Sequence, residues 1–238
     1  MRCALVVAAL LTTAPALNAG EPAVSAPGLE AFPANPDPAL RYVVYLHGRI
    51  VEDQGRKAVS PELGPYQFDE IVAALQTAAG GDGSVVVAEL RKKDADASRS
   101  ATHTAMEIRR LLAGGVAASA ITVVGASKGG VIAMLVSTQV ENDDVGYAIL
   151  GGCSEDVVKG MFGGRISLHG RVLSIFEKTD PIGRSCQAIL SGSKGLKQSA
   201  ELELNTRLRH GFLYKPLVEW VAPVEAWIAG RKVPEALP

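Results

Sequence analysis

Six short apolar segments alternate with longer segments of helical period along most of this chain, and this alternation restricts the possible folds more than any other feature. The six segments are residues 42–46, 85–88, 121–124, 147–150, 172–176 and 200–204. The first five are almost continuously apolar and rich in Val and Ile, which is typical of strands buried on both faces. In the sixth, Glu201 and Glu203 alternate with Leu202 and Leu204. One face of that strand should therefore meet water, which predicts a place at the edge of the sheet.

Three of the intervening segments have the period and the end signals of helices. Residues 68–79 end at Gly80-Gly81, and residues 100–113 end at Gly114-Gly115; glycine is the usual residue just beyond a helix C-terminus. Residues 217–228 carry an apolar stripe that includes both tryptophans, which we therefore expect in the core. Strands that alternate with helices form parallel sheets with right-handed crossovers. We predict a single doubly wound α/β domain with a mainly parallel sheet of about six strands and helices on both faces.

The N-terminal residues have the pattern of an export signal. Residues 1–19 contain one basic residue, an apolar run and then small residues, as secretory signal peptides do. A buried N-terminal helix is the alternative interpretation. Residues 20–38 contain five prolines and no apolar period, which predicts an extended linker before a domain at 39–238. We expect a secreted or periplasmic protein without a membrane span, because no other apolar segment approaches the roughly 20 residues that a span requires.

Charge and cysteine content exclude several classes of protein. The net charge of −1 argues against nucleic-acid binding, which normally requires a basic face. Three cysteines without a CxxC pair indicate neither a disulfide scaffold nor a zinc site, and we expect no metal and no cofactor. Cys153 and Cys186 follow neighbouring predicted strands, so a disulfide between them and two separate buried thiols are both open. Nothing in the sequence indicates an oligomeric state.

A G-x-S-x-G motif lies between the third predicted strand and a helical segment at 131–140. It reads Gly125-Ala126-Ser127-Lys128-Gly129. In this context the motif makes a tight turn that exposes a nucleophilic serine above the sheet, at a helix N-terminus that favours negative charge. Small residues are required on both sides because strand and helix nearly touch there. A glycine-rich helix start without chemistry is the alternative.

A serine nucleophile needs a base, and the base needs an acid that orients it. Asp180 follows the fifth strand and His210 follows the sixth, so both lie at the same edge of a parallel sheet as Ser127. Glu177 and Asp156 are alternative acids. His210 is better placed than the other histidines: His103 falls within a predicted helix, His169 precedes the fifth strand at the opposite edge, and His47 ends the first strand, near the site.

These motifs together resemble the α/β-hydrolase family over residues 40–230. The resemblance rests on His47-Gly48, the glycine-flanked Ser127, and the chain order Ser127, Asp180, His210. It implies oxyanion-hole N–H donors at Gly48 or Arg49 and at Lys128. The sequence departs from the family pattern in lacking the usual first two strands and any insertion large enough for a cap domain. This favours a small, uncapped, esterase-like member.

Charged residues of both signs surround the predicted site. Residues 49–66 form a long polar segment that we expect to be a loop beside it. The cations are Arg91, Lys92, Lys93, Lys128 and Arg184, and the acids are Glu52, Asp53, Glu62, Asp94 and Asp96. A solvated rim of mixed charge is the preferred interpretation, and a site for an anionic or polar substrate is the alternative.

The sequence as a whole predicts an exported serine hydrolase that cleaves an ester or thioester of a small molecule through an acyl-enzyme. Ser127 would be the nucleophile, His210 the base and Asp180 the acid that orients it. Two alternatives remain: a non-catalytic binding protein on a hydrolase scaffold, and an enzyme that transfers the acyl group to an acceptor other than water or performs perhydrolysis.

Overall fold

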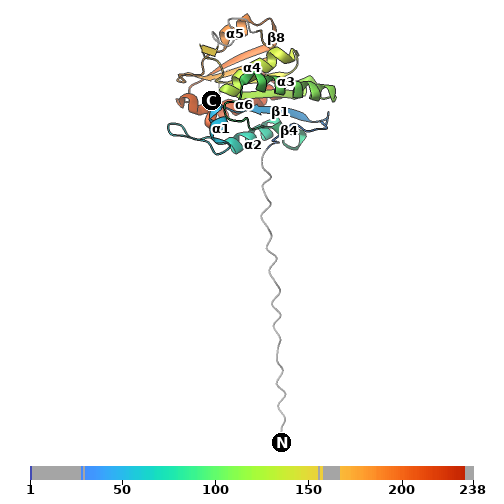
Figure 1. Cartoon of the computed structure of the whole chain (residues 1–238), viewed down its shortest axis with the longest axis vertical. Coiled ribbons are helices and arrows are strands. Elements are labelled where there is room, and N and C mark those ends of the chain that lie inside the picture. The colour runs from blue at the N-terminus through green and yellow to red at the C-terminus, as the bar shows by residue number, and fades with distance from the viewer. Residues whose placement is uncertain (2–27, 29, 155, 158–166, 234–238) are drawn as a thin grey trace.

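The computed structural model describes residues 1, 28, 30–154, 156–157 and 167–233 (Figure 1). Except for Met1, the predicted signal peptide at 1–19 lies outside the described residues, as do residues 20–27 and 29 of the predicted linker. Residues 30–38 lie against the domain: the Arg110 guanidinium donates hydrogen bonds to the carbonyl oxygens of Pro33 and Ala34, at 2.8 and 3.1 Å. Phe32 packs against the core.

The described residues form one six-stranded parallel sheet with the strand order β4-β1-β5-β6-β7-β8. Its strands are β1 (Arg41–Leu46), β4 (Ser84–Val87), β5 (Ile121–Ala126), β6 (Gly146–Leu150), β7 (His169–Glu177) and β8 (Gly195–Leu204). The predicted doubly wound sheet is confirmed, and the half-polar strand β8 lies at an edge. The largest differences from the predicted bounds are in β7 and β8, which begin at His169 and at Gly195 and are therefore much longer than predicted.

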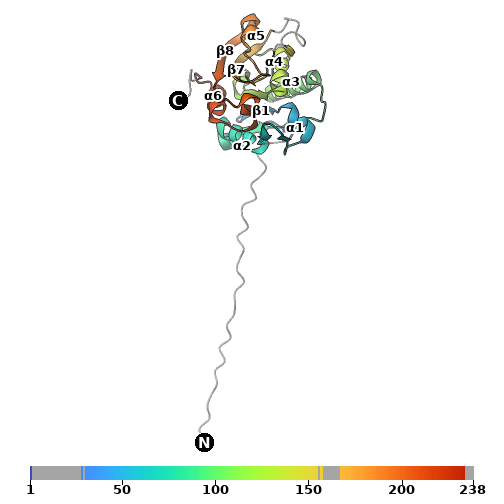
Figure 2. The same ribbon diagram turned by 90° about the vertical axis from the view of Figure 1, so that its left-hand side faces the viewer.

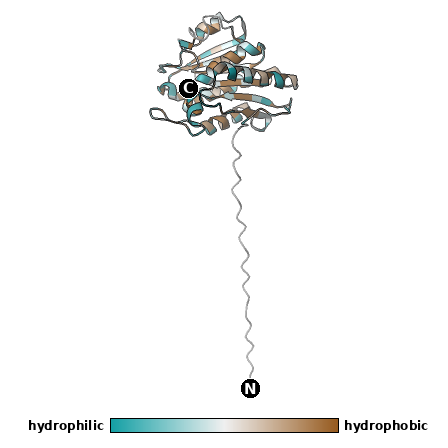
Figure 3. Ribbon diagram, viewed as in Figure 1, coloured by the Kyte–Doolittle hydropathy of each residue, from teal (hydrophilic) through white to brown (hydrophobic). Residues whose placement is uncertain are grey.

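Helices cover both faces of the sheet, as Figures 1 and 2 show. They are α1 (Arg49–Gln54), α2 (Phe68–Ala79), α3 (Ala97–Ala113), α4 (Lys128–Val140), α5 (Gln187–Gly192) and α6 (Val218–Ile228). The core accordingly has two halves, one with α2 and α6 and the other with α3, α4 and α5. Brown and teal alternate along the helices in Figure 3, as expected for helices with one face on a sheet.

Strand β1 shows why the central strands are apolar throughout. Val43 and Tyr45 belong to the half of the core that contains α2, whereas Tyr42 and Val44 belong to the half that contains α4. Successive side chains of a strand point to opposite faces, so a strand covered on both sides needs apolar residues at every position. The two tryptophans, Trp220 and Trp227 of α6, are buried in the core as predicted.

The expected loop at 49–66 is not structureless. Its first residues form α1, and later residues form a small antiparallel pair, β2 (Val59–Ser60) and β3 (Gly64–Pro65). The prediction failed because helix α1 is only six residues long and has a mixed polar sequence, RIVEDQ, in which periodicity is hard to detect. Among the described helices, none is both long and apolar enough to cross a bilayer.

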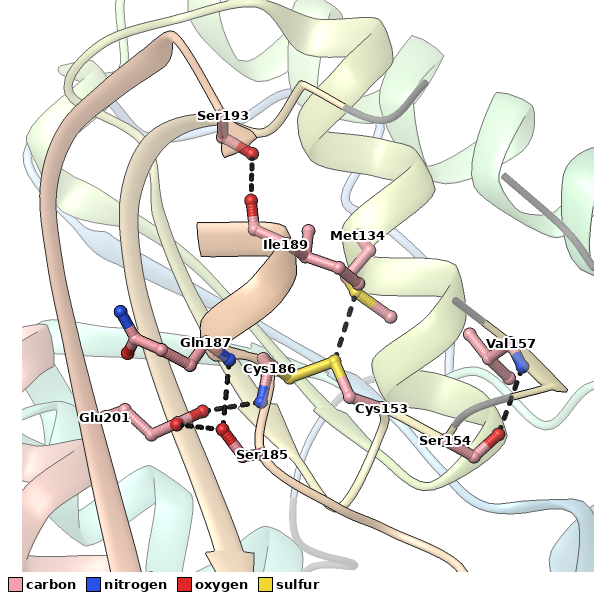
Figure 4. Close-up of a disulfide and its surroundings, with 10 residues drawn as sticks. All are labelled: Met134, Cys153, Ser154, Val157, Ser185, Cys186, Gln187, Ile189, Ser193 and Glu201. Carbon is pink, nitrogen blue, oxygen red and sulfur yellow. Dashed lines mark hydrogen bonds between the residues drawn. A yellow bond between two sulfur atoms is a disulfide. The ribbon is translucent and has the colours of Figure 1, made fainter. Parts of the chain in front are cut away.

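A disulfide joins Cys153, which follows β6, to Cys186, which precedes α5 (Figure 4). The two sulfur atoms are 2.09 Å apart, and both side chains are buried. The same loop is held to β8 on its other side, because Glu201 accepts hydrogen bonds from Ser185 Oγ and from the backbone N–H of Cys186, at 2.5 and 2.6 Å. The segment that follows Asp180 is therefore fixed to the residues after β6 and to strand β8.

Reduction of this disulfide should destabilise the protein. The cysteines are 33 residues apart, and opening a loop of that size costs about 3–4 kcal/mol through the entropy of the unfolded chain. We expect urea unfolding of the wild type to shift to lower denaturant on addition of a reductant. The Cys153→Ala/Cys186→Ala variant should unfold at that lower concentration with or without reductant. A wild-type curve that does not respond to reductant would contradict the cross-link.

Candidate active site

Ser127 lies in a sharp turn between β5 and α4. Its φ of 53° and ψ of −118° belong to a region that residues other than glycine rarely adopt, and such strain costs on the order of 1–3 kcal/mol. The backbone N–H of Ser127 donates a hydrogen bond of 2.8 Å to Leu150 O at the end of β6. The turn thus holds the serine side chain at the carboxyl edge of the sheet.

The glycines around Ser127 allow the end of β5, the start of α4 and the end of β1 to approach one another closely. A Cβ on Gly129 would lie 1.8 Å from the carbonyl oxygen of Leu46 at the end of β1. A Cβ on Gly125 would lie 2.3 Å from the carbonyl oxygen of Gly129. Both distances are far below any van der Waals contact, so the turn can form only with glycine at these positions.

The structure brings Ser127, His210 and Asp180 into one chain of hydrogen bonds. His210 Nε2 is 2.9 Å from Ser127 Oγ, and His210 Nδ1 is 2.6 Å from Asp180 Oδ2. Asp180 is completely buried, and its other carboxylate oxygen accepts a hydrogen bond from the backbone N–H of Ile182. A carboxylate can only accept here, so Nδ1 carries a proton and the unprotonated Nε2 can accept the serine proton. This is the arrangement that nucleophilic catalysis by serine requires.

The alternative acids take other positions. Glu177 is completely buried at the end of β7, and its carboxylate accepts hydrogen bonds from the backbone N–H and the hydroxyl of both Thr179 and Thr206. Burial raises the pKa of Glu177, but these hydrogen bonds outweigh burial and hold the pKa below its usual value. Glu177 thus fastens together the segments that lead to Asp180 and His210. Asp156 is exposed.

The other histidines do not contact Ser127. His103 lies on the exposed face of α3 and bonds Glu89, and His169 lies at the start of β7. His47 is completely buried. Its Nε2 accepts a hydrogen bond of 3.0 Å from the backbone N–H of Arg91, which leaves Nδ1 to donate to Gly48 O at 2.9 Å. Burial, assisted by the Arg91 charge, lowers the pKa of His47 to about 4.

Two helix starts meet beside the serine. Arg49 is the first residue of α1 and Lys128 the first residue of α4, and the N–H groups of the first helical turn have no partner within the helix. The two segments lie close together, since a Cβ on Gly48 would be 3.6 Å from Ser127 Cβ. Of the two donors that the sequence left open, Arg49 belongs to the first turn of α1, whereas Gly48 is the residue that precedes the helix.

A cavity of about 470 Å³ opens beside Ser127 and His210. Its wall is mostly apolar and comes from α1, α4, the residues after β6 and the residues after His210. The apolar side chains in this wall are those of Ile50, Tyr66, Ala97, Ala126, Val131, Val157, Ile182, Leu213 and Tyr214. A cavity of this size and character suits the apolar part of a small molecule.

The solvated rim predicted around the site is wrong for three of its charged residues. Glu52 is buried, and its two carboxylate oxygens pair with Arg91 Nε at 2.7 Å and Lys128 Nζ at 2.6 Å. Burial raises the pKa of Glu52, but the hydrogen bonds from Lys128 and Arg91 outweigh this and hold the pKa below its usual value. Arg91 and Lys128 are therefore partly buried and paired with a buried carboxylate, instead of solvated. The described residues include no cluster of three or more His, Cys, Asp or Glu side chains that could hold a metal ion.

Comparison with known proteins identifies the fold. No protein-family model matches this sequence, and no curated protein sequence is significantly similar to it. Among solved structures, a hyperthermophilic esterase from the archaeon Pyrobaculum calidifontis superposes with a TM-score of 0.55 at 16% identity, over 82% of this chain and 78% of the esterase. A protein of unknown function from Agrobacterium tumefaciens, proposed to be an α/β hydrolase, gives 0.53 at 15% identity, over 85% and 92% of the two chains. The chain has the α/β-hydrolase fold.

A third similar structure agrees with this assignment. A protein proposed to be a cell surface hydrolase of Lactobacillus plantarum superposes with a TM-score of 0.51 at 12% identity, over 83% of this chain and 94% of that protein. In the α/β-hydrolase fold the motif G-x-S-x-G occupies the turn between a strand and the following helix, which is where Ser127 lies between β5 and α4.

Replacing Gly129 should disrupt the turn. In Gly129→Ala the new methyl group would overlap the Leu46 carbonyl oxygen, and because both partners are backbone, the strand and the helix must separate. We expect the free energy of unfolding to fall by more than about 3 kcal/mol, measured by urea unfolding. Gly192→Ala is the matched control, since a Cβ there meets nothing within 4 Å. Equal stability of the two variants would contradict the close approach.

The buried neutral His47 should make folding stability depend on pH. Its pKa is about 4 in the folded protein against 6.5 ordinarily, so the unfolded chain binds more protons between these values and stability falls as the pH is lowered through them. The expected loss is about 3 kcal/mol from about pH 7 to about pH 4. Urea unfolding across this range should show a steeper decline for the wild type than for His47→Asn. Parallel curves would show that His47 titrates normally.

Proposed function

We propose that this protein is a serine hydrolase that cleaves an ester or thioester of a small molecule through an acyl-enzyme. The observation that carries the proposal is the hydrogen-bonded chain from Ser127 Oγ through His210 to Asp180, with the serine in a strained turn beside an apolar cavity. The similarity to the Pyrobaculum calidifontis esterase agrees with it.

In the first half of the reaction, Ser127 Oγ attacks the carbonyl carbon of the substrate. His210 Nε2 takes the serine proton, and the buried Asp180 carboxylate stabilises the imidazolium ion that results. The carbonyl oxygen gains negative charge, which the backbone N–H groups of Arg49 and Lys128 would bind as an oxyanion hole. Collapse of this intermediate expels the alkoxide or thiolate, which takes the proton from His210.

Water completes the reaction. It attacks the acyl-enzyme while His210 Nε2 takes one of its protons, and a second tetrahedral anion forms in the same oxyanion hole. Collapse releases the carboxylic acid and returns the proton to Ser127. Acyl transfer to another acceptor would use the same residues. A non-catalytic binding protein would have no use for a complete Ser127–His210–Asp180 chain, so the structure favours catalysis over binding alone.

The apolar cavity would hold the acyl part of the substrate. Its volume of about 470 Å³ accommodates a small molecule, and its walls offer few polar partners. We therefore propose esters of apolar carboxylic acids as substrates. We also propose that the protein is exported: residues 1–19 have the signal-peptide pattern, and the disulfide between Cys153 and Cys186 suits an oxidising compartment.

Removing the serine or altering the acid should abolish turnover without unfolding the protein. In Ser127→Ala no nucleophile remains, and in Asp180→Asn the amide favours the wrong imidazole tautomer. We expect each change to lower kcat by about 10⁴-fold or more, measured on a series of p-nitrophenyl esters of increasing acyl length. A fluorophosphonate should label the wild type at Ser127 and leave Ser127→Ala unlabelled.

The control for this series is Ser191→Ala, which removes an exposed hydroxyl on α5, away from the cavity. This variant should be labelled and should hydrolyse esters like the wild type. Wild-type protein that is neither labelled nor active on any ester or thioester would refute the proposed function.

A further inference from the structure

The pair of ionic contacts at Glu52 connects two separate parts of the site. Glu52 lies in the first turn of α1, three residues after Arg49, whereas Lys128 directly follows Ser127 at the start of α4. The Glu52 carboxylate holds Lys128 Nζ with one oxygen and Arg91 Nε with the other, at 2.6 and 2.7 Å. A single side chain therefore links α1 to α4 and to the segment after β4.

The cations of this cluster are also tied to the backbone around the site. The Arg91 guanidinium donates to the carbonyl oxygen of His47, and the Arg91 backbone N–H donates to His47 Nε2. Lys128 Nζ donates to the carbonyl oxygen of Ala95 at 2.6 Å. The cluster thus fixes the end of β1, where the chain turns into α1, as well as the helix that begins after Ser127.

Burial makes these contacts costly to break. The side chains of Glu52, Arg91 and Lys128 are 0%, 8% and 16% exposed. Exposed ion pairs exchange readily with water, but a buried carboxylate that loses its partners bears the full cost of desolvation. The Nη1 atom of Arg91 is buried and has no hydrogen-bond partner within the described part of the chain. The Arg91 guanidinium therefore stays in place although one of its N–H donors is unsatisfied. Such a cluster contributes little net stability, yet it allows one geometry.

We propose that Glu52 is the positioning residue of the oxyanion hole: it sets the distance between the Arg49 and Lys128 N–H groups by bridging α1 and α4. This inference rests on the proposed function, because it concerns the groups that would bind the oxyanion. Glu52 is not among the residues that line the cavity, so it would act through the two backbone segments that it connects. A displacement of about 1 Å in such donors is enough to slow an enzyme about 100-fold.

The first test is Glu52→Gln, which keeps the shape of the side chain and removes its charge. We expect kcat to fall about 100-fold while KM for a good ester changes less than about threefold. The inhibition constant of a trifluoromethyl ketone should rise by the same factor as kcat falls, because Ser127 converts this ketone into a tetrahedral anion that needs both N–H groups. Glu225→Gln, which breaks an exposed ion pair between Glu225 of α6 and Arg231, is the matched control and should behave as the wild type.

A double variant separates positioning from charge balance. Glu52→Gln leaves two partly buried cations without an anion, whereas Glu52→Gln/Lys128→Met restores the net charge of the cluster without restoring the bridge. We expect the double variant to regain thermal stability and to keep the low kcat and the weak binding of the trifluoromethyl ketone. Wild-type kcat in the double variant would overturn the proposal, because Glu52 would then serve only to neutralise the cations.

Glu52→Asp covers the case in which Glu52→Gln does not fold. It keeps the charge but shortens the side chain by one methylene, so the bridge cannot span the same distance. We expect kcat to fall with little change in stability, and wild-type kcat in Glu52→Asp would overturn the proposal. Labelling of the wild type at Ser127 distinguishes the two hypotheses. If the wild type is active and the Glu52 variants are fully active, only the positioning role is refuted. If the wild type is neither labelled nor active, the proposed function is refuted, and the oxyanion role with it.

Discussion

The contact between the start of α4 and the end of β1 determines the arrangement of everything above the sheet. Gly129 lies against the carbonyl oxygen of Leu46 so closely that no side chain fits between them. Because β1 pairs with β5 in the sheet, this contact folds the chain back sharply after β5 and leaves Ser127 at the tip of the turn. The same contact brings the residues after β1 to the turn, where a Cβ on Gly48 would lie 3.6 Å from Ser127 Cβ.

Three buried carboxylates hold the loops around this turn. Asp180 orients His210, Glu177 joins the segments after β7 and β8, and Glu52 joins α1 to α4. The apolar core beneath the sheet edge cannot do this, because it fixes strands and helices but not the connections between them. A buried carboxylate is tolerated only with its hydrogen bonds in place, so each of these groups restricts a loop to one conformation. The sheet and the helices supply stability, and the buried carboxylates fix the positions of the loops around Ser127.

The sheet and the main helices could be predicted because burial on one or both faces gives each element a recognisable pattern of apolar residues. Strands covered on both faces are apolar at every position, and the edge strand β8 alternates Glu with Leu. The short helix α1 has no such apolar pattern. Glu52 and Arg91 were predicted on a solvated rim, since charged residues in polar segments are usually exposed. Only the distance between their side chains, which lie 39 residues apart in the chain, shows that they form a buried pair.

The sequence by itself determined the α/β architecture, the turn at Ser127 and the order in which Ser127, Asp180 and His210 follow parallel strands. These depend on local features: apolar runs, glycines that permit a close approach, and the rule that parallel strands end at one edge. Tertiary structure alone decided which acid faces His210, how the segment at 49–66 folds, and that Glu52 bridges α1 and α4. Those outcomes depend on contacts between residues far apart in the chain, whose distances and burial exist only once the sheet has assembled.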